Sequence, residues 1–218
     1  MNKQGKGKIE WTDWTWNPVR GLCPVGCSYC YARGMYKHYG WDSSIRLDED
    51  ELVRPMVKVK PLKIFVCSTF EIFHPAADEH RDVIFDVIKS CPRHIFQILT
   101  KMPENIDRPM PDNVFLGVSI TGENMDFNKW PTLCEAKVKL KFISFEPILS
   151  PLWMITDFKT EMPSWVIMGR LTGHGKAHNP SRDDIVEMTR YFQKHRVRVF
   201  QKHNLNELMG HPLIQEMP

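Results

Sequence analysis

Three cysteines stand close together near the start of the chain, in the stretch GLCPVGCSYCYARG at residues 21–34. Cys23, Cys27 and Cys30 follow a CxxxCxxC spacing, and an aromatic residue, Tyr31, comes directly after the last of them. Thiolates are ligands for zinc and for iron, and a CxxC pair can also act as a redox couple. The spacing therefore allows part of a zinc site, a redox pair with a spare thiol, or the three-cysteine seat of an iron–sulfur cluster.

A cluster accounts for the three cysteines more completely than the other two sites do. A structural zinc site normally has four protein ligands, and the chain has no second CxxC pair, which leaves His38 as the candidate for a fourth ligand. A thioredoxin-like pair would use Cys27 and Cys30 but would leave Cys23 without a role. Three cysteines on a four-iron cluster leave one iron open, and an open iron can bind a substrate or cofactor.

Six short apolar runs rich in branched and aromatic residues recur along the chain, and each is typical of a strand that is buried on both faces. They are KIFVC (63–67), HIFQIL (94–99), NVFLGVSI (113–120), KLKFISF (139–145), SWVIMG (164–169) and VRVFQ (197–201). Between several of them lie segments with helical spacing. We expect amphipathic helices over residues 78–90 and 181–195, the second capped by Ser181, and a shorter helix over residues 28–38.

Strands that alternate with helices over the whole length predict an α/β protein with parallel strands. With a first strand near residues 14–19, the chain has about six to seven strands, and this number favours a parallel, partial β/α barrel over an open sheet. No Gly/Ser linker divides the chain. Residues 1–218 are therefore expected to form a single domain.

The composition limits the classes of protein to which the chain can belong. It is long enough, at 218 residues, to bury a sizeable core, and its net charge of +3 permits a nucleic-acid partner without indicating one. No apolar stretch approaches the ~20 residues that span a bilayer, and no apolar segment follows the basic start as in a secretory signal. We therefore expect a cytoplasmic protein with no membrane contact and with reduced or metal-bound cysteines, Cys91 and Cys134 being small buried residues.

Polar residues follow four of the predicted strands at the point where each strand ends. The stretches are CSTFE (67–71), TK (100–101), SIT (119–121) and FEP (145–147). Because the chemistry of parallel α/β folds gathers at the carboxyl ends of the strands, these residues are expected to converge on one rim. The cysteine loop follows the first strand and is expected at the same rim.

The CxxxCxxC spacing with its following aromatic resembles the signature of the radical S-adenosylmethionine (radical SAM) superfamily. The resemblance implies a [4Fe–4S] cluster on Cys23, Cys27 and Cys30, whose open iron chelates the amino and carboxylate groups of S-adenosyl-L-methionine. It also implies that one electron from the reduced cluster cleaves this cofactor to methionine and a 5′-deoxyadenosyl radical. An external one-electron donor, flavodoxin- or ferredoxin-like, belongs to the same expectation.

Further stretches are similar to the phage Gp37/Gp68-type family, also known as a domain of unknown function. They run from about Ile9 to Asn204 and include IEWTDWTWNPVRGLC, IFHP, LTKMPENI, LGVSI, FISFEPIL and WVIMG. Members of that family commonly have a longer cysteine loop and often a Gly-Gly-Glu after the WVI strand. This chain has MGRLTGHGKAHNP at that point, so no role of that glutamate is carried over.

The resemblance to the radical SAM superfamily assigns roles to residues at the strand ends. Tyr31 is similar to the aromatic that lies beside the adenine. Ser68, Thr69 and Glu71 match the small and acidic residues that receive the methionine ammonium, since a carboxylate beside an ammonium forms a charge-assisted pair. Glu146 stands where a later strand end meets the ribose hydroxyls.

Three more residues resemble positions in spore photoproduct lyases, radical SAM enzymes that repair a thymine dimer. Lys101 and Ser119 are similar to the pair that holds the cofactor carboxylate. The stretch CSTFE (67–71) looks like the C-[ST]…[DE] setting of the hydrogen-donating cysteine, with one extra residue before the acid, whereas Gp37/Gp68-type proteins tend to have glycine there. Because a thiol S–H bond is weak enough to donate a hydrogen atom, Cys67 is either a catalytic hydrogen donor or a buried cysteine without a chemical role.

Basic residues crowd the last part of the chain and could hold an anionic substrate if they lie on the active rim. They are Lys194, His195, Arg196, Arg198, Lys202 and His203, together with Arg170, His174, Lys176 and His178. With the resemblance of Cys67, they favour modification or repair of DNA or RNA, although a solvated helix end and loop explain them as well. Two rivals stay open: a non-catalytic zinc- or cluster-stabilised nucleic-acid-binding module, and a barrel hydrolase, for which no nucleophile–base motif is visible.

Overall fold

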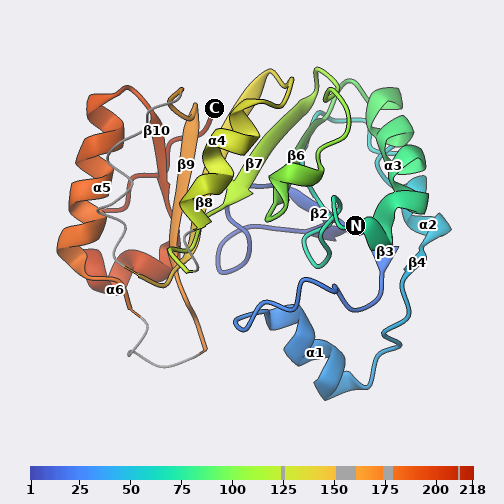
Figure 1. Cartoon of the computed structure of the whole chain (residues 1–218), viewed down its shortest axis with the longest axis horizontal. Coiled ribbons are helices and arrows are strands. Elements are labelled where there is room, and N and C mark those ends of the chain that lie inside the picture. The colour runs from blue at the N-terminus through green and yellow to red at the C-terminus, as the bar shows by residue number, and fades with distance from the viewer. Residues whose placement is uncertain (124–125, 151–160, 174–178, 211) are drawn as a thin grey trace.

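Most strands of the chain belong to one curled sheet that forms a half-barrel (Figure 1). The structure is a computed structural model, and it describes residues 1–123, 126–150, 161–173, 179–210 and 212–218. Among these residues the sheet has eight strands, in the order β1 (Asn2–Lys3), β2 (Trp14–Trp16), β5 (Lys63–Val66), β6 (Ile95–Thr100), β7 (Val114–Ser119), β8 (Leu140–Ile148), β9 (Trp165–Arg170) and β10 (Arg198–Gln201). A separate antiparallel pair consists of β3 (Val19–Arg20) and β4 (Arg46–Leu47).

The α/β class and the parallel sheet are confirmed, but the predicted number of six to seven strands is too low. The strands from β2 and from β5 to β10 pair in parallel and coincide with the seven predicted strands. The additional strand, β1, pairs antiparallel with β2. Its two residues are polar and exposed, so the strand has no apolar pattern from which it could be predicted.

The described chain has the helices α1 (Tyr31–Tyr39), α2 (Glu49–Leu52), α3 (Asp78–Ser90), α4 (Lys129–Cys134), α5 (Arg182–Lys194) and α6 (Asn206–Met209), with single 3₁₀ turns at 75–77, 103–105, 126–128 and 203–205. The helices α1, α3 and α5 occupy the three predicted segments, whereas the short helices α2, α4 and α6 were not predicted. The Ser181 hydroxyl caps α5 by accepting from the Asp184 N–H at 3.0 Å. In the described part of the chain, no helix is long and apolar enough to cross a bilayer.

One face of the sheet, here called the outer face, packs against α3, α4 and α5, which follow its curve (Figure 1). Alternate strand residues such as Ile64, Val66 and Val118 point to this side. They join apolar residues of the helices, for example Phe85 of α3 and Phe192 of α5, in the larger core. Burial of each such side chain contributes roughly 1.5–3 kcal/mol, so the helices fix the curvature of the sheet.

The opposite, inner face is filled by aromatic rings from the other set of alternate residues. Trp11, from the segment before β2, lies with its ring centroid 4.7 Å from that of Phe65 and 6.1 Å from that of Trp165. Phe142 and Phe200 complete this aromatic cluster, at 5.2 and 6.2 Å from Trp165. The cluster closes the amino-terminal part of the inner face.

Gly117 of β7 makes room for one of these rings. A Cβ atom at this position would lie 2.4 Å from the Phe142 ring, closer than any van der Waals contact. We therefore expect Gly117→Ala to lower the free energy of unfolding by about 1–3 kcal/mol, measured by urea denaturation. Gly34→Ala is the matched control, because a Cβ there meets nothing within 4 Å and alanine favours the helix. Equal unfolding midpoints for both variants would contradict the packing described.

Candidate functional site

A cavity of about 360 Å³ lies on the inner face, at the carboxyl ends of the strands. Trp11 and Phe65 of the aromatic cluster line it, together with the cysteine loop and the ends of β5 to β10. The predicted site residues that line it are Cys23, Cys27, Cys30, Tyr31, Cys67, Ser68, Thr69, Glu71, Lys101, Ser119 and Glu146. The fold thus gathers every predicted site residue at one place, and what each can do depends on its own contacts.

The cysteine loop connects β3 to α1 and is tied to that helix. The Tyr36 hydroxyl accepts from the Gly21 N–H at 2.9 Å, at the start of the loop. Arg33 donates to the Cys23 carbonyl at 3.0 Å, and α1 begins directly after Cys30. The helix therefore sets the position of the loop that carries the thiols.

The cysteines in the described chain are all free thiols. Burial raises the pKa of the Cys23 thiol, and the Tyr29 hydroxyl hydrogen-bonds Cys27. Within the described residues, no three His, Cys, Asp or Glu side chains converge closely enough to hold one metal ion. A four-iron cluster makes a different demand, because each thiolate binds a separate iron at a separate corner.

The donor set around the cavity fits an iron–sulfur cluster. Cys23, Cys27 and Cys30 offer three soft sulfur donors, which favour iron–sulfur clusters or zinc over hard cations such as Mg²⁺. The cavity also has unsatisfied polar atoms on its wall. The Ser144 hydroxyl and the Trp11 indole N–H are buried without a hydrogen-bond partner among the described residues. Such atoms cost about 1–3 kcal/mol each, so a polar ligand in the cavity would relieve them.

Glu71 is a buried carboxylate that joins two strand ends. Its oxygens accept from the Thr100 hydroxyl at 2.8 Å, the Lys101 N–H at 2.7 Å and the Phe73 N–H at 3.2 Å. Burial raises the pKa of this carboxyl, and the three hydrogen bonds oppose the rise. Glu71 therefore connects the ends of β5 and β6, a structural role that was not predicted from the sequence.

Lys101 directs its ammonium toward the cysteine loop. The Lys101 Nζ donates to the Tyr29 hydroxyl at 3.0 Å and lies 5.2 Å from the centre of the Tyr29 ring. Ser119, on the neighbouring strand, lines the same cavity with a buried side chain. Sequence reasoning missed Tyr29, which connects the predicted cofactor lysine with the cysteine loop.

The loop after β5 presents backbone and hydroxyl groups to the cavity. The Ser68 hydroxyl donates to Asn17 Oδ1 at 3.1 Å, and its carbonyl accepts from the Tyr31 hydroxyl at 3.4 Å. Thr69 lines the cavity and is half-buried. Tyr31 is 59% exposed, so its ring stands at the cavity mouth and not in its interior.

Glu146 and Lys202 form an ion pair across the inner face, through Glu146 Oε1 and the Lys202 ammonium. Gly169 lies between them, and a Cβ there would come within 3.1 Å of the Lys202 chain and 3.3 Å of the Glu146 carboxyl. The glycine therefore leaves the space in which the pair forms. Glu146 was predicted to meet ribose hydroxyls, but Lys202 already binds its carboxylate.

Cys67 directly follows β5 and has an unusual backbone conformation. Its φ of 53° is in the left-handed region, which costs a residue other than glycine about 1–2 kcal/mol. The Cys67 N–H donates to the Trp16 carbonyl at 2.7 Å, and the Val19 backbone hydrogen-bonds its sulfur. Burial raises the pKa of the thiol to about 12, so Cys67 keeps its proton at neutral pH. Because glycine adopts this conformation without the same cost, it would suit this position.

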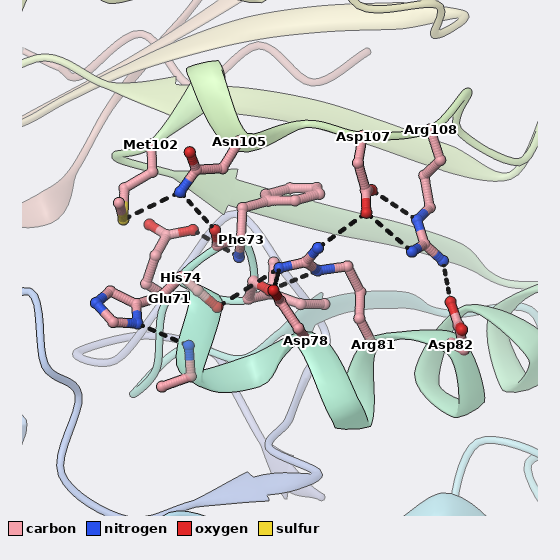
Figure 2. A network of polar contacts seen from close by, with 12 residues as sticks. Glu71, Phe73, His74, Asp78, Arg81, Asp82, Met102, Asn105, Asp107 and Arg108 are labelled. Carbon is pink, nitrogen blue, oxygen red and sulfur yellow. Dashed lines mark hydrogen bonds and ion pairs between the residues drawn. The ribbon is translucent and has the colours of Figure 1, made fainter.

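Two loops of the rim are joined by a network of ion pairs and hydrogen bonds (Figure 2). The buried Arg81 of α3 donates to the Ile72 carbonyl at 3.1 Å and pairs with Asp107 at 3.0 Å. Asn105 donates to the Phe73 carbonyl, also at 3.0 Å. The network connects the loop that follows β5 with the loop that follows β6, and so holds Glu71 in place. No motif in the sequence indicated it.

The predicted basic cluster at residues 194–203 does not lie together. Arg196 and Arg198 are at the amino-terminal end of β10, whereas Lys202 follows its carboxyl end. Residues 199–201 of the strand separate the two groups, so Lys202 reaches the cavity, His203 follows it at the same end of the strand, and Lys194, His195, Arg196 and Arg198 lie toward the opposite end. Arg170 also lines the cavity. His174, Lys176 and His178, in which two histidines have an HxxxH spacing, lie outside the described residues.

Fold and cavity together define an α/β half-barrel protein with a thiol-lined site at the carboxyl ends of its strands. The chain belongs to the family described as "Protein of unknown function (DUF5131)", which residues 6–204 match. The match includes the cysteine loop and every strand of the large sheet except β1. No curated protein and no solved structure matches the chain. Since the family description names no activity, the function has to come from the residues of the site.

The ion pairs of Asp107 predict a specific dependence of stability on pH. A hydrogen bond from Arg108 is the main reason why the pKa of Asp107 falls to about 2, below its ordinary value near 3.9. The carboxylate therefore stabilises the fold above about pH 4, and this contribution is lost as the pH falls toward 2. Asp107→Asn should lower the free energy of unfolding at pH 7 by less than about 1 kcal/mol, because solvent screens a half-exposed pair.

Urea denaturation at pH 7 and at pH 2.5 measures this effect. The difference between wild type and Asp107→Asn should shrink at the lower pH. Asp86→Asn is the control, because Asp86 makes its ion pair with Lys89 on the exposed surface of α3. A difference for Asp107→Asn that stays constant over this range would contradict the pairing.

Proposed function

We propose that the chain is a radical SAM enzyme whose [4Fe–4S] cluster is held by Cys23, Cys27 and Cys30. The observation that supports this most strongly is the presence of three thiols on one cavity at the carboxyl ends of parallel strands. When bound and reduced, the cluster would supply S-adenosyl-L-methionine with the electron that generates a 5′-deoxyadenosyl radical. A flavodoxin- or ferredoxin-like protein would be the external electron donor.

The polar residues of the wall would bind the amino-acid part of S-adenosyl-L-methionine. Lys101 supplies a cation for the carboxylate, with Ser119 as a hydroxyl partner on the next strand. An ionised carboxylate has about four acceptor positions, and Glu71 uses three hydrogen bonds within the fold. It therefore retains capacity for the methionine ammonium, beside Ser68 and Thr69.

The nucleoside part would lie toward the mouth of the cavity. Tyr31 offers an exposed ring there for the adenine. Glu146 can meet the ribose hydroxyls only while it also accepts from Lys202. Ser144, also on the cavity wall, would supply a hydroxyl that has no hydrogen-bond partner within the described chain.

Cys67 would act as the hydrogen donor to a substrate radical. Cys67 lines the cavity, and its thiol keeps its proton. Transfer of the hydrogen atom forms a C–H bond on the substrate and breaks the S–H bond, which leaves a thiyl radical. One electron from the external donor and one proton from solvent then restore the thiol.

The substrate class that we propose is nucleic acid, for modification or photoproduct-type repair. Lys101, Arg170 and Lys202 line the cavity; Lys202 pairs with Glu146 and Arg170 with Glu207, whereas the Lys101 ammonium donates to the neutral Tyr29 hydroxyl and keeps its charge for an anionic group. The resemblance of Cys67 to the hydrogen donor of photoproduct lyases supports the same class.

Formation of 5′-deoxyadenosine tests the proposed chemistry. The protein is purified without oxygen, reconstituted with iron and sulfide, reduced with dithionite and mixed with S-adenosyl-L-methionine. We expect 5′-deoxyadenosine in chromatography from the wild type and none from Cys30→Ala. Cys134→Ala is the control, because this cysteine lies outside the cavity. Stoichiometric zinc, no iron absorbance and no product would contradict the proposal and favour the zinc-stabilised nucleic-acid-binding module.

Cys67→Ala and Cys67→Gly test the hydrogen donor. Both variants remove the thiol, and glycine also relieves the left-handed strain of the backbone. A change in products that both variants share therefore comes from the loss of the thiol and not from a folding defect. In D₂O, the wild type should place solvent deuterium from the exchanged thiol in the nucleic-acid product, as mass spectrometry can detect. Both variants should still form 5′-deoxyadenosine but yield a different product distribution without this label. Unchanged products and labelling would remove Cys67 from the mechanism.

A further inference from the structure

The helix that follows the cysteine loop carries an exposed aromatic stripe. Tyr31, Met35 and Tyr39 recur at every fourth position of α1, so they lie on one side of the helix. Tyr39 is 60% exposed and Trp41, just beyond the helix, is 48% exposed. Ala32 is the buried residue of α1. Figure 1 shows α1 apart from the helices that cover the sheet.

The end of this stripe is held in a fixed geometry. The Trp41 N–H donates to the Tyr36 carbonyl at 3.2 Å, which turns the chain back toward the helix. The Trp41 ring then stacks on Tyr39, with centroids 5.2 Å apart and an interplanar angle of 19°, and meets the edge of Tyr36 at 5.5 Å. Tyr39, which the His38 ring also contacts at 4.6 Å, and Trp41 therefore form a preformed pair of stacked rings that stays about half exposed.

The charge around these rings is positive. Residues 21–41 contain no Asp or Glu, whereas Arg33 and Lys37 lie on the same helix as the stripe; the acid that follows Trp41, Asp42, pairs with Arg46 at 2.8 Å. Lys37 and His38 are exposed. Rings combined with cations, and with the adjacent acid already paired, suit a polyanion that carries flat bases, because bases stack on the rings while phosphates meet the cations.

The stripe also continues into the proposed active site. Its first residue, Tyr31, lines the mouth of the cavity and donates to the Ser68 carbonyl. A strand that lies along α1 would therefore pass directly over the thiol-lined cavity. This continuity distinguishes α1 from the aliphatic exposed patch at Val53, Met56, Val57 and Val59, which precedes β5 and so lies at the opposite end of the strands.

We infer that α1 and Trp41 form a stacking platform for single-stranded nucleic acid, which delivers an unpaired base to the cavity. The inference rests on the proposed function for the purpose of the bound strand, but binding itself requires neither S-adenosyl-L-methionine nor turnover. Unpaired bases are needed because the faces of paired bases in a duplex are already stacked on their neighbours.

Fluorescence anisotropy measures this binding. The full chain, reconstituted with iron and sulfide, is titrated into a fluorescein-labelled DNA single strand of about 20 nucleotides and, separately, into the same sequence as a duplex. We expect the single strand to bind more tightly. Tyr39→Ala and Trp41→Ala should each weaken binding at least about five-fold, the loss of one stacked base. Tyr39→Phe and Trp41→Phe, which keep a ring, should restore most of the affinity.

Control variants separate stacking from general effects. Val59→Ala removes an apolar side chain that is 86% exposed at the opposite rim and should leave the affinity unchanged. Lys37→Gln should reduce the salt dependence of binding, by a slope of about 0.7 for one lost phosphate contact. Urea denaturation of each variant verifies its fold.

Three results would overturn the inference: no binding up to about 0.1 mM protein, equal binding by wild type and the alanine variants, or tighter binding of the duplex. Binding of phosphatidylserine vesicles in place of the oligonucleotide, dependent on Tyr39 and Trp41, would assign the stripe to a membrane surface and equally overturn it. Binding of the single strand without formation of 5′-deoxyadenosine would refute the radical chemistry and support the stacking platform. Formation of 5′-deoxyadenosine without binding of the single strand would support the radical chemistry and refute the stacking platform.

Discussion

The packing of the inner face is the constraint on which the candidate site depends. Side chains on a strand alternate between faces, so inward positions follow one another at every second residue. Along these positions large side chains give way to small or polar groups toward the carboxyl end: Phe142 to Ser144 in β8, and Ile167 to Gly169 in β9. The aromatic cluster fills one end of the half-barrel, and the cavity is what remains at the other.

Two buried polar connections keep the rim of that cavity in one shape. Glu71 binds the end of β6 through Thr100 and Lys101, and Arg81 holds the two neighbouring loops against α3. Because both groups are buried and hydrogen-bonded, removal of either would leave unsatisfied partners. A rim held in this way can position Cys67 and Lys101 before any ligand binds, which is the preorganisation that a cofactor site requires.

Much of the fold could be predicted because it rests on local patterns. The helix at Asp78–Ser90 shows clear apolar periodicity, the strand at Trp165–Arg170 is a continuous apolar run, and polar residues at strand ends indicated the common rim. The pairing of Glu146 with Lys202 could not be predicted, because it joins residues 56 positions apart whose approach depends on the glycine between them. The separation of the basic residues at 194–203 was missed for a simpler reason: nearness in sequence along a strand does not mean nearness in space.

Mössbauer spectroscopy of the protein reconstituted with ⁵⁷Fe tests the central claim most directly, because it reports on each iron of a cluster. If Cys23, Cys27 and Cys30 hold a [4Fe–4S] cluster with one open iron, the spectrum should show the signals of a [4Fe–4S] cluster, and iron analysis should give about four irons per chain. Addition of S-adenosyl-L-methionine should then shift the signal of one iron and leave the other three unchanged. A protein that takes up zinc and no iron, or a cluster spectrum that S-adenosyl-L-methionine does not alter, would contradict the account.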